Sequence, residues 1–171
     1  SVRGQETNMG NLIADAMREF TKADVGFTQG GGIRGDKIYP AGTVLTRKDI
    51  LTELPFGNVV VVTEISGADL RAAVENGVSQ VADRAGRFPQ VSGMSFVYDP
   101  AKPAGARVFE IKVGGAPLDN AKTYKVATND FMLEGGDGYA ALGKGKVLVN
   151  KCAVTLMATV VMDYVAAQKG V

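Results

Sequence analysis

The spacing of apolar residues along the chain predicts four helices. They are expected at residues 8–20, at 46–54, after a cap at Ser66 with a buried stripe from Leu70 to Val81, and at about 153–167. Thr7 or Asn8 can cap the first helix, and Thr46-Arg47-Lys48-Asp49 resembles a capping box before the second, which Pro55 ends. The last pattern is the strongest, with its apolar stripe at Leu156, Met157, Val160, Val161, Tyr164 and Val165.

Five other stretches have the β-branched or alternating pattern of strands. They are residues 23–28, 58–65, 91–98, 107–113 and 124–128. Gly114-Gly115 indicates a tight turn, Ala116-Pro117 is expected to delay the next strand, and residues 129–139 are expected to form a long loop. Strands and helices are mixed without regular alternation, and no linker divides the chain. We therefore predict one α+β domain over residues 1–171, with mixed β-sheets flanked by helices.

Charge and composition exclude several classes of protein. The chain has 19 Lys and Arg residues and 18 Asp and Glu residues, so its formal charge is +1. It therefore lacks the basic surface that nucleic acid or an anionic membrane requires. It contains no His and one Cys, which removes imidazole catalysis, most zinc sites and any internal disulfide. The longest apolar stretch, around residues 59–62, is too short to span a bilayer. We expect no catalytic residue and no metal site in this chain.

The remaining reactive or charged side chains are assigned ordinary positions. Cys152 precedes an apolar helix and is expected to be buried as a small hydrophobic residue. Five basic residues are expected to be solvated surface charges: Arg84, Arg87, Lys144, Lys146 and Lys151. The chain begins at Ser1 with neither an initiator Met nor a signal-peptide pattern, so we expect a piece of a longer protein.

A glycine-rich loop follows the first predicted strand. Gly30-Gly31-Gly32-Ile33-Arg34-Gly35 matches the G-x-G-x-x-G pattern, but the residues up to Pro40 do not form the helix that a dinucleotide site requires. The backbone N–H groups of the loop could hold an anion beside Arg34, or the glycines could serve only a structural turn. A similar loop follows Thr128, and the two loops could meet at one ligand site or be unrelated turns. The residues alone leave these alternatives open.

Two further loops carry a phenylalanine beside glycine. Phe56, in Leu54-Pro55-Phe56-Gly57-Asn58, is either a core residue or an exposed platform for stacking. Phe131 precedes Gly136-Asp137-Gly138, so a ring and a carboxylate could bind a base and hydroxyl groups. The simpler alternative buries Phe131 in the core and makes the Gly-Asp-Gly run a turn, and the residues alone favour it.

Taken together, these motifs resemble the C-terminal domain of the 5′-nucleotidase family, and the resemblance covers nearly the whole chain. The motifs that carry it occur in this order: Glu6-Thr7-Asn8-Met9-Gly10-Asn11-Leu12-Ile13-Ala14-Asp15-Ala16, Gly30-Gly31-Gly32-Ile33-Arg34, Leu54-Pro55-Phe56-Gly57-Asn58, Asn129-Asp130-Phe131 and Gly135-Gly136-Asp137-Gly138-Tyr139. Members of this family are two-domain metallophosphoesterases. Their N-terminal domain carries two metal ions and a catalytic Asp-His pair, and their C-terminal domain carries the substrate pocket.

The resemblance implies a role for individual residues. Arg3 and Arg34 would contact phosphate, and Phe56 and Phe131 would enclose the base between their rings. Asn58 would reach the base edge, and Asp137 would accept hydrogen bonds from the ribose hydroxyls. Gly31 belongs to the substrate-binding loop. Gln29 stands where family members usually have an Asn that contacts the phosphate side, so this position departs from the family pattern.

The resemblance also implies a function. The chain would be the substrate-binding domain of a metal-dependent 5′-nucleotidase, inactive by itself, with two divalent metal ions in the missing N-terminal domain. Its partners would be a nucleotide or nucleoside and that domain, with no nucleic acid and no membrane span, in the periplasm or at the cell surface. Relatives also act on UDP-sugars, cyclic nucleotides and sulfur esters, and the phenylalanine pair favours a nucleotide. The alternatives are a stand-alone nucleotide- or sugar-binding module, and a domain that has kept the fold and lost the ligand.

Overall fold

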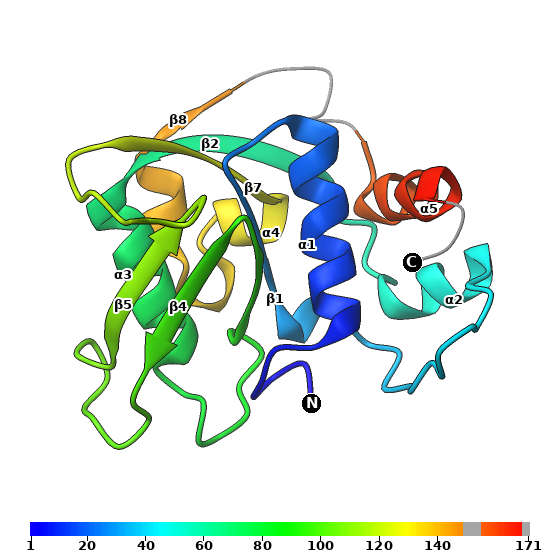
Figure 1. The fold of residues 1–171 in the computed structure, drawn as a ribbon, viewed down its shortest axis with the longest axis horizontal. Coiled ribbons are helices and arrows are strands. Elements are labelled where there is room, and N and C mark those ends of the chain that lie inside the picture. Colours follow the sequence, from blue (N-terminus) through cyan, green and yellow to red (C-terminus); the bar gives the residue numbers. More distant parts are fainter. Residues whose placement is uncertain (149–154, 169–171) are drawn as a thin grey trace.

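The computed structural model describes residues 1–148 and 155–168, and it places two β-sheets with helices packed around them (Figure 1). The helices are α1 (Asn8–Thr21), α2 (Arg47–Glu53), α3 (Gly67–Val78), α4 (Asp130–Leu133) and α5 (Met157–Gln168). The strands are β1 (Val25–Gln29), β2 (Val60–Ser66), β3 (Pro89–Ser92), β4 (Met94–Tyr98), β5 (Val108–Val113), β6 (Ala116–Pro117), β7 (Thr123–Asn129) and β8 (Lys146–Val147). The predicted α+β class, with mixed sheets and flanking helices, is confirmed.

The larger sheet brings three chain segments to one edge. Its order is β3-β1-β7-β2-β8, and β1 and β7 are parallel while the other pairs are antiparallel. Because β1 and β7 run in the same direction, Gln29 and Asn129 end side by side. β2 runs against β7, with Val60 opposite Asn129, so the segment that leads into β2 reaches the same edge. Loops that are far apart in the sequence therefore converge here.

Two hydrophobic clusters cover the two faces of this sheet. One cluster joins α1, α2 and α5 through residues such as Met17, Ile50 and Val161. The other joins α3 and the smaller sheet, β4-β5-β6, through residues such as Leu70 and Ile111. Figure 1 shows these two groups of elements on either side of β1 and β7. The sheet edge at which the loops converge therefore lies between the two clusters, and packing on both faces of the sheet holds it in place.

Three predicted helix starts are confirmed, among them the cap of α3 at Ser66, and the last helix begins later than predicted. Thr7 caps α1, and Thr46 and Asp49 form the reciprocal capping box of α2, with the Asp49 N–H donating to Thr46 Oγ1 at 3.2 Å and the Thr46 N–H to Asp49 Oδ2 at 2.9 Å. Leu156 was expected on the buried stripe of the last helix, but it precedes α5, pairs with Val59 and is exposed. In α3 the regular helix ends at Val78, before the predicted Val81.

Three predictions about strands and loops are wrong. Residues 91–98 form two strands in different sheets, because Gly93, with φ of +72°, turns the chain between β3 and β4. Ala116–Pro117 does not delay the next strand but is itself β6, paired with β5 directly after the Gly114-Gly115 turn. Residues 129–139 contain the short helix α4 and a 3₁₀ turn at Gly136–Gly138.

Two further expectations, for Cys152 and Lys151, lie outside the described residues. No helix among those described is long and apolar enough to cross a membrane.

Candidate functional site

The site forms where β1 and β7 end, and the cap of α4 fixes its first side chains. Asn129 is the N-cap of α4, and its Oδ1 accepts a hydrogen bond from the Met132 N–H at 2.9 Å. Nδ2 of Asn129 therefore donates to Oε1 of Gln29, also at 2.9 Å. This leaves Nε2, the donor of the Gln29 amide, on the side of Gly32, where a Cβ would lie 3.3 Å from it. Because Oε1 of Gln29 accepts from Asn129, Nε2 is the group of this amide that is left to donate beside the glycine-rich loop.

Three N–H groups of the glycine-rich loop, those of Gly30, Gly31 and Ile33, are used inside the protein. Gly30 donates to the carbonyl oxygen of Phe88 at 2.8 Å, and Gly31 donates to that of Gly86 at 2.7 Å. Ile33 donates back to Gly30 at 3.1 Å. These three N–H groups are therefore not available as a cradle for an anion, and the exposed guanidinium of Arg34 is the charged donor of this loop.

Gly31 and Gly86 are glycines because two backbones meet there. A Cβ on Gly31 would lie 2.8 Å from Cα of Gly86, and a Cβ on Gly86 would lie 3.2 Å from Cα of Gly31 and 3.3 Å from Oδ2 of Asp137. The segment around Gly86 therefore touches both the glycine-rich loop and the Asp137 loop. These two loops, for which the sequence left both a shared site and unrelated turns open, meet at one place.

The buried Glu53 holds the backbone of the Arg34 segment through both its carbonyl oxygen and its carboxylate. The Arg34 N–H donates to the carbonyl oxygen of Glu53 and the Gly35 N–H to Oε2 of Glu53, both at 2.9 Å. The hydroxyl of Tyr39 donates to Oε1 of the same side chain at 2.9 Å. Burial and the neighbouring Glu53 raise the pKa of Tyr39 to about 12, so this hydroxyl stays a donor at neutral pH. The guanidinium of Arg34 is left in solvent, 5.7 Å from the centre of the Phe56 ring.

Arg3, the second predicted phosphate contact, is brought beside the same loop by a buried glutamine. Nε2 of Gln90 donates to the carbonyl oxygens of Val2 and Gln5, at 2.9 and 2.8 Å. A Cβ on Gly30 would lie 3.2 Å from the backbone N of Arg3, so the N-terminal segment passes directly against the loop. The half-buried Arg3 therefore lies near the glycine-rich loop that ends at Arg34.

The two phenylalanines are surface residues on loops that are joined to each other. Phe56 is 60% exposed and Phe131 is 40% exposed, so the core position favoured for Phe131 is wrong. Nδ2 of Asn58 donates to Oδ1 of Asp130 at 2.8 Å, and the Val59 N–H donates to the same oxygen at 3.2 Å. One N–H of the Asn58 amide therefore joins the two loops, and its Oδ1 remains as an acceptor.

Gly136 provides the surface on which the Phe131 ring lies. A Cβ on Gly136 would come within 2.5 to 2.6 Å of three carbons of that ring. The absence of a side chain therefore lets the ring lie flat against the backbone of the Gly-Asp-Gly turn. The ring, the turn and Asp137 form one unit, because Asp137 is the next residue.

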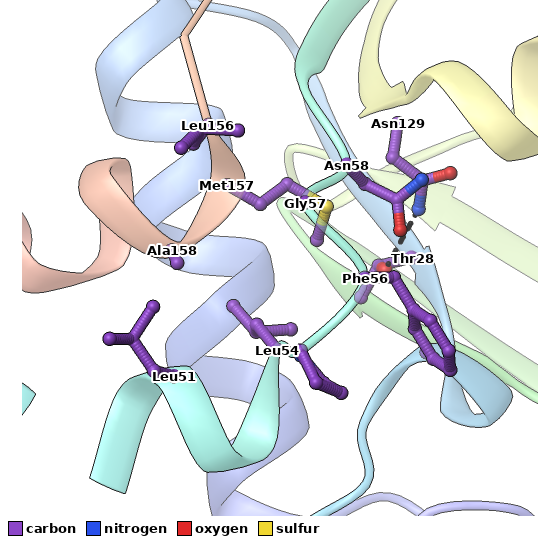
Figure 2. Close-up of a pocket in the computed structure, with 12 residues that line it drawn as sticks. Thr28, Leu51, Leu54, Phe56, Gly57, Asn58, Asn129, Leu156, Met157 and Ala158 are labelled. Carbon is purple, nitrogen blue, oxygen red and sulfur yellow. Dashed lines mark hydrogen bonds between the residues drawn. The ribbon is translucent and has the colours of Figure 1, made fainter. Parts of the chain in front are cut away.

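A cavity of about 270 Å³ opens beside Phe56 (Figure 2). Thr28, Asn58 and Asn129 lie at one end of it, and Leu51, Leu54 and Ala158 from the helices lie at the other. Of the predicted site residues, Phe56 and Asn58 line this cavity, whereas Phe131, Asp137, Arg34 and Arg3 do not. The predicted residues are therefore spread along the edge, and this cavity lies at the end that carries Phe56 and Asn58.

Asp137 has a left-handed backbone conformation, with φ of 55° and ψ of 21°. Its carbonyl oxygen accepts a hydrogen bond from Nδ2 of Asn76 at 3.1 Å. The next residue but one, Tyr139, is fully buried and donates its hydroxyl to the carbonyl oxygen of Arg87. Burial, together with the negative charge of Asp137, raises the pKa of Tyr139, and the positive charge of Arg87 acts in the opposite direction. Tyr139 is therefore a neutral hydrogen-bond donor under the site.

Arg87 is not the solvated charge that the sequence suggested. Its Nη1 donates to Oδ1 of Asn76 at 3.3 Å and to Oγ of Ser79 at 3.1 Å, and the side chain is partly buried. Sequence reasoning also missed Asn76, Gln90 and the capping role of Asn129. The sequence around Arg87 shows only that it stands between Gly86 and Phe88. Its partner, Asn76 on α3, could not be identified from these neighbours.

No three His, Cys, Asp or Glu side chains gather into a possible metal site within residues 1–148 and 155–168. What the edge offers instead is an exposed cation, two exposed rings, amide groups and a carboxylate on short, well-anchored loops. These groups suit the binding of a ligand that has an anionic part, a flat apolar part and hydroxyl groups.

Comparisons with known proteins identify close relatives. Residues 1–144 match the family model described as 5′-nucleotidase, C-terminal domain. The chain is 40% identical over 149 residues to Protein UshA of Escherichia coli (strain K12), which covers 87% of this chain and 26% of that protein. It is 39% identical over 150 residues to Trifunctional nucleotide phosphoesterase protein YfkN of Bacillus subtilis (strain 168), which covers 81% of this chain and 10% of that protein.

A crystal structure of a 5′-nucleotidase precursor from Thermus thermophilus has the same fold. It superposes with a TM-score of 0.91 at 39% identity, covering 100% of this chain and 34% of that one. The chain thus spans about a third or less of the length of each of these three proteins.

Proposed function

Because the chain belongs to the 5′-nucleotidase C-terminal domain family, we propose that it is the substrate-binding domain of a two-domain, metal-dependent nucleotidase that hydrolyses nucleoside 5′-phosphates. The observation that carries the proposal is the pair of exposed phenylalanines on loops that the Asn58–Asp130 hydrogen bond joins. Two exposed rings on anchored loops suit a flat base, since a base can stack on each of its faces.

The other groups of the edge suit the remaining parts of a nucleotide. Arg34 and Arg3 supply positive charge for the phosphate, and the N–H group of Gln29 points toward the same loop. Oδ1 of Asn58 is free to accept a hydrogen bond from the base edge, because its Nδ2 already binds Asp130. The carboxylate of Asp137 can accept from both ribose hydroxyls at once. Gly31 contributes by letting Gly86 approach, which keeps the phosphate and ribose groups close together.

The hydrolytic step would belong to the other domain. Two divalent metal ions held there would activate the attacking water and stabilise charge on the phosphate. The chain has no His, and no three possible metal ligands gather within residues 1–148 and 155–168, so the proposal places the metal ions in the other domain. Its own task is to bind the nucleoside and hold the phosphate where the other domain can act on it. By family resemblance we place the whole protein in the periplasm or at the cell surface.

We expect this chain alone to release no phosphate from AMP, even with added Mn²⁺, Co²⁺ or Zn²⁺. The reason is the absence of His from the chain and of a ligand cluster from its described residues. A phosphate-release assay on the purified chain checks this. Activity that stays with the chain through repeated purification would show that the two-domain assignment is wrong.

The ribose contact gives the test of the proposed function. Asp137→Asn should weaken binding of adenosine to this chain about tenfold, because an amide offers one acceptor oxygen where the carboxylate offers two charged ones. Binding of 2′,3′-dideoxyadenosine should change little, since it has no hydroxyl pair. Titration followed by NMR chemical shifts measures both affinities, and a melting temperature shows that the variant is folded.

Glu134→Gln is the matched control, because it removes an exposed carboxylate from the same loop outside the proposed contacts. Adenosine affinity that is equal for Asp137→Asn, Glu134→Gln and the unchanged chain would return Asp137 to the status of a turn residue. No binding of adenosine to the folded, unchanged chain would rule out the nucleoside site as a whole.

A further inference from the structure

We propose that Asn76 and Arg87 are positioning residues that determine how strongly the site selects a ribose with both hydroxyl groups. They do so by holding Asp137 in its left-handed conformation, and the inference rests on the proposed function of Asp137. Neither residue belongs to the motifs that carry the family resemblance. Both come from segments that the sequence places about 50 to 60 residues before Asp137.

Asp137 needs such support because its backbone is in a region that favours glycine. It has a φ of 55°, and Gly138, which follows it, has a φ of 82°. Most L-residues rarely occupy this conformation, Asp occupies it more often than most, and contacts from the surrounding structure help to hold it there. The hydrogen bond from Nδ2 of Asn76 to the Asp137 carbonyl oxygen, at 3.1 Å, is a contact from outside the loop that does this.

Arg87 fixes which way the Asn76 amide points. Nη1 of Arg87 donates to Oδ1 of Asn76 at 3.3 Å, and an arginine can only donate. The oxygen of the amide is therefore held toward Arg87, and the N–H group must face Asp137. Arg87 is itself held at its backbone by the hydroxyl of the buried Tyr139 and at its side chain by Ser79, 3.1 Å away. The chain of contacts thus runs from the core to the proposed ribose contact.

The same segment also sets the distance from Asp137 to the phosphate side of the site. Gly86 and Phe88, on either side of Arg87, accept the N–H groups of Gly31 and Gly30. A Cβ on Gly86 would lie 3.3 Å from Oδ2 of Asp137, so the carboxylate lies directly against this segment. Residues 86–88 therefore hold both the glycine-rich loop and the Asp137 loop. A change at Asn76 affects only the connection to the Asp137 loop.

Asn76→Asp isolates the single hydrogen bond. The new carboxylate has the same shape and can still accept from Arg87, but it has no N–H group for the Asp137 carbonyl oxygen. We expect adenosine affinity of this chain to fall about fivefold, within the range of coupling energies for residues in contact. Affinity for 2′,3′-dideoxyadenosine should stay within about twofold. The three-bond HN–Hα coupling of Asp137, which reports φ without any ligand, should change as well.

Matched variants separate this effect from charge and from loss of stability. Asn120→Asp makes the same change at an exposed asparagine and should leave both affinities and the coupling unchanged. Asn76→Ala removes the N–H group without adding charge and should act like Asn76→Asp. If either Asn76 variant fails to fold, Arg87→Lys serves instead, since it keeps the charge but loses the planar fork. Its control is Arg84→Lys, at an exposed position of the same connection.

The outcomes are distinct. Selective loss of adenosine binding with a changed Asp137 coupling supports the proposal. An equal fall for both nucleosides would show a purely structural role and overturn it, and so would an unchanged preference for the hydroxyl pair. If the unchanged chain binds adenosine through Phe131 but shows no preference for the hydroxyl pair, this inference is overturned while the nucleoside site stands. If it binds no nucleoside, the proposed function fails, and this inference fails with it.

Discussion

Replacing Phe56 and Phe131 together by alanine should abolish detectable binding of adenosine to this chain. Stacking of one base on one aromatic ring contributes about 1–3 kcal/mol. Each single variant should therefore lose about tenfold in affinity or more, and the double variant at least about a hundredfold if the two rings act independently. Both side chains are exposed, at 60% and 40%, so their removal should cost little stability.

The matched control is Phe109→Ala. Phe109 is also 60% exposed, but it lies on β5 in the smaller sheet, away from the loop edge. Its replacement removes the same apolar surface and should leave adenosine affinity unchanged. Chemical-shift titration of the four variants and of the unchanged chain measures the affinities, and thermal melting confirms that each protein is folded. A double variant that still binds adenosine like the unchanged chain would refute the stacking of a base between these rings.

The two single variants also report on geometry. If the base contacts both rings at once, the losses of binding free energy should not be additive. The sum of the losses for Phe56→Ala and Phe131→Ala should then differ from the loss in the double variant. If only one ring binds the base, one single variant should reproduce the double variant and the other should resemble the control. The hydrogen bond from Asn58 to Asp130 connects the loops, so we expect both rings to contribute.

Tyr139→Ala should lower the free energy of unfolding by about 3–5 kcal/mol, the usual cost of removing a large buried aromatic side chain. Tyr139 is fully buried, and its ring meets that of Phe27 edge-on, with 5.5 Å between the centres and 79° between the planes. A Cβ on Gly77 would lie 2.8 Å from the tyrosine hydroxyl, so Gly77 has no side chain with which to fill the space. Urea denaturation measures the change.

Tyr139→Phe divides this effect into packing and hydrogen bonding. It keeps the ring and removes only the hydroxyl that binds the Arg87 carbonyl oxygen, so about 1 kcal/mol should be lost. Because burial raises the pKa of Tyr139, the hydroxyl keeps its proton, and the difference between the variants should not depend on pH between about 6 and 9. A loss below about 1 kcal/mol for Tyr139→Ala would contradict the assigned packing.

Local patterns determined much of the fold before any tertiary contact was considered. The capping box at Thr46 and Asp49 and the cap at Thr7 mark their helices because the partners lie within three residues of each other. The Val-rich run that forms β2 is correctly predicted as a strand from local sequence as well, since β-branched residues favour the extended backbone. The family resemblance likewise came from ordered local motifs, and the matched family model agrees with it.

The tertiary structure decided what each loop residue does. Gly93 separates two strands that look like one, because only the pairing of β3 with β1 shows where the larger sheet ends. Phe131 looked like a core residue, yet its ring lies on Gly136 at the surface. Arg87 looked like a solvated charge, yet it binds Asn76, 11 residues away along the chain.

These failures share one physical cause. A backbone N–H group or a charged side chain has the same chemistry whether it faces a ligand or another part of the chain. The glycine-rich loop shows this most clearly, because its sequence suits an anion, while residues 86 and 88 take up its N–H groups. Which partner each group meets depends on sheet order and register, since these bring residues 30, 87 and 137 together. The sequence by itself determined most of the elements and the family, and the contacts between distant segments determined how the candidate site is built.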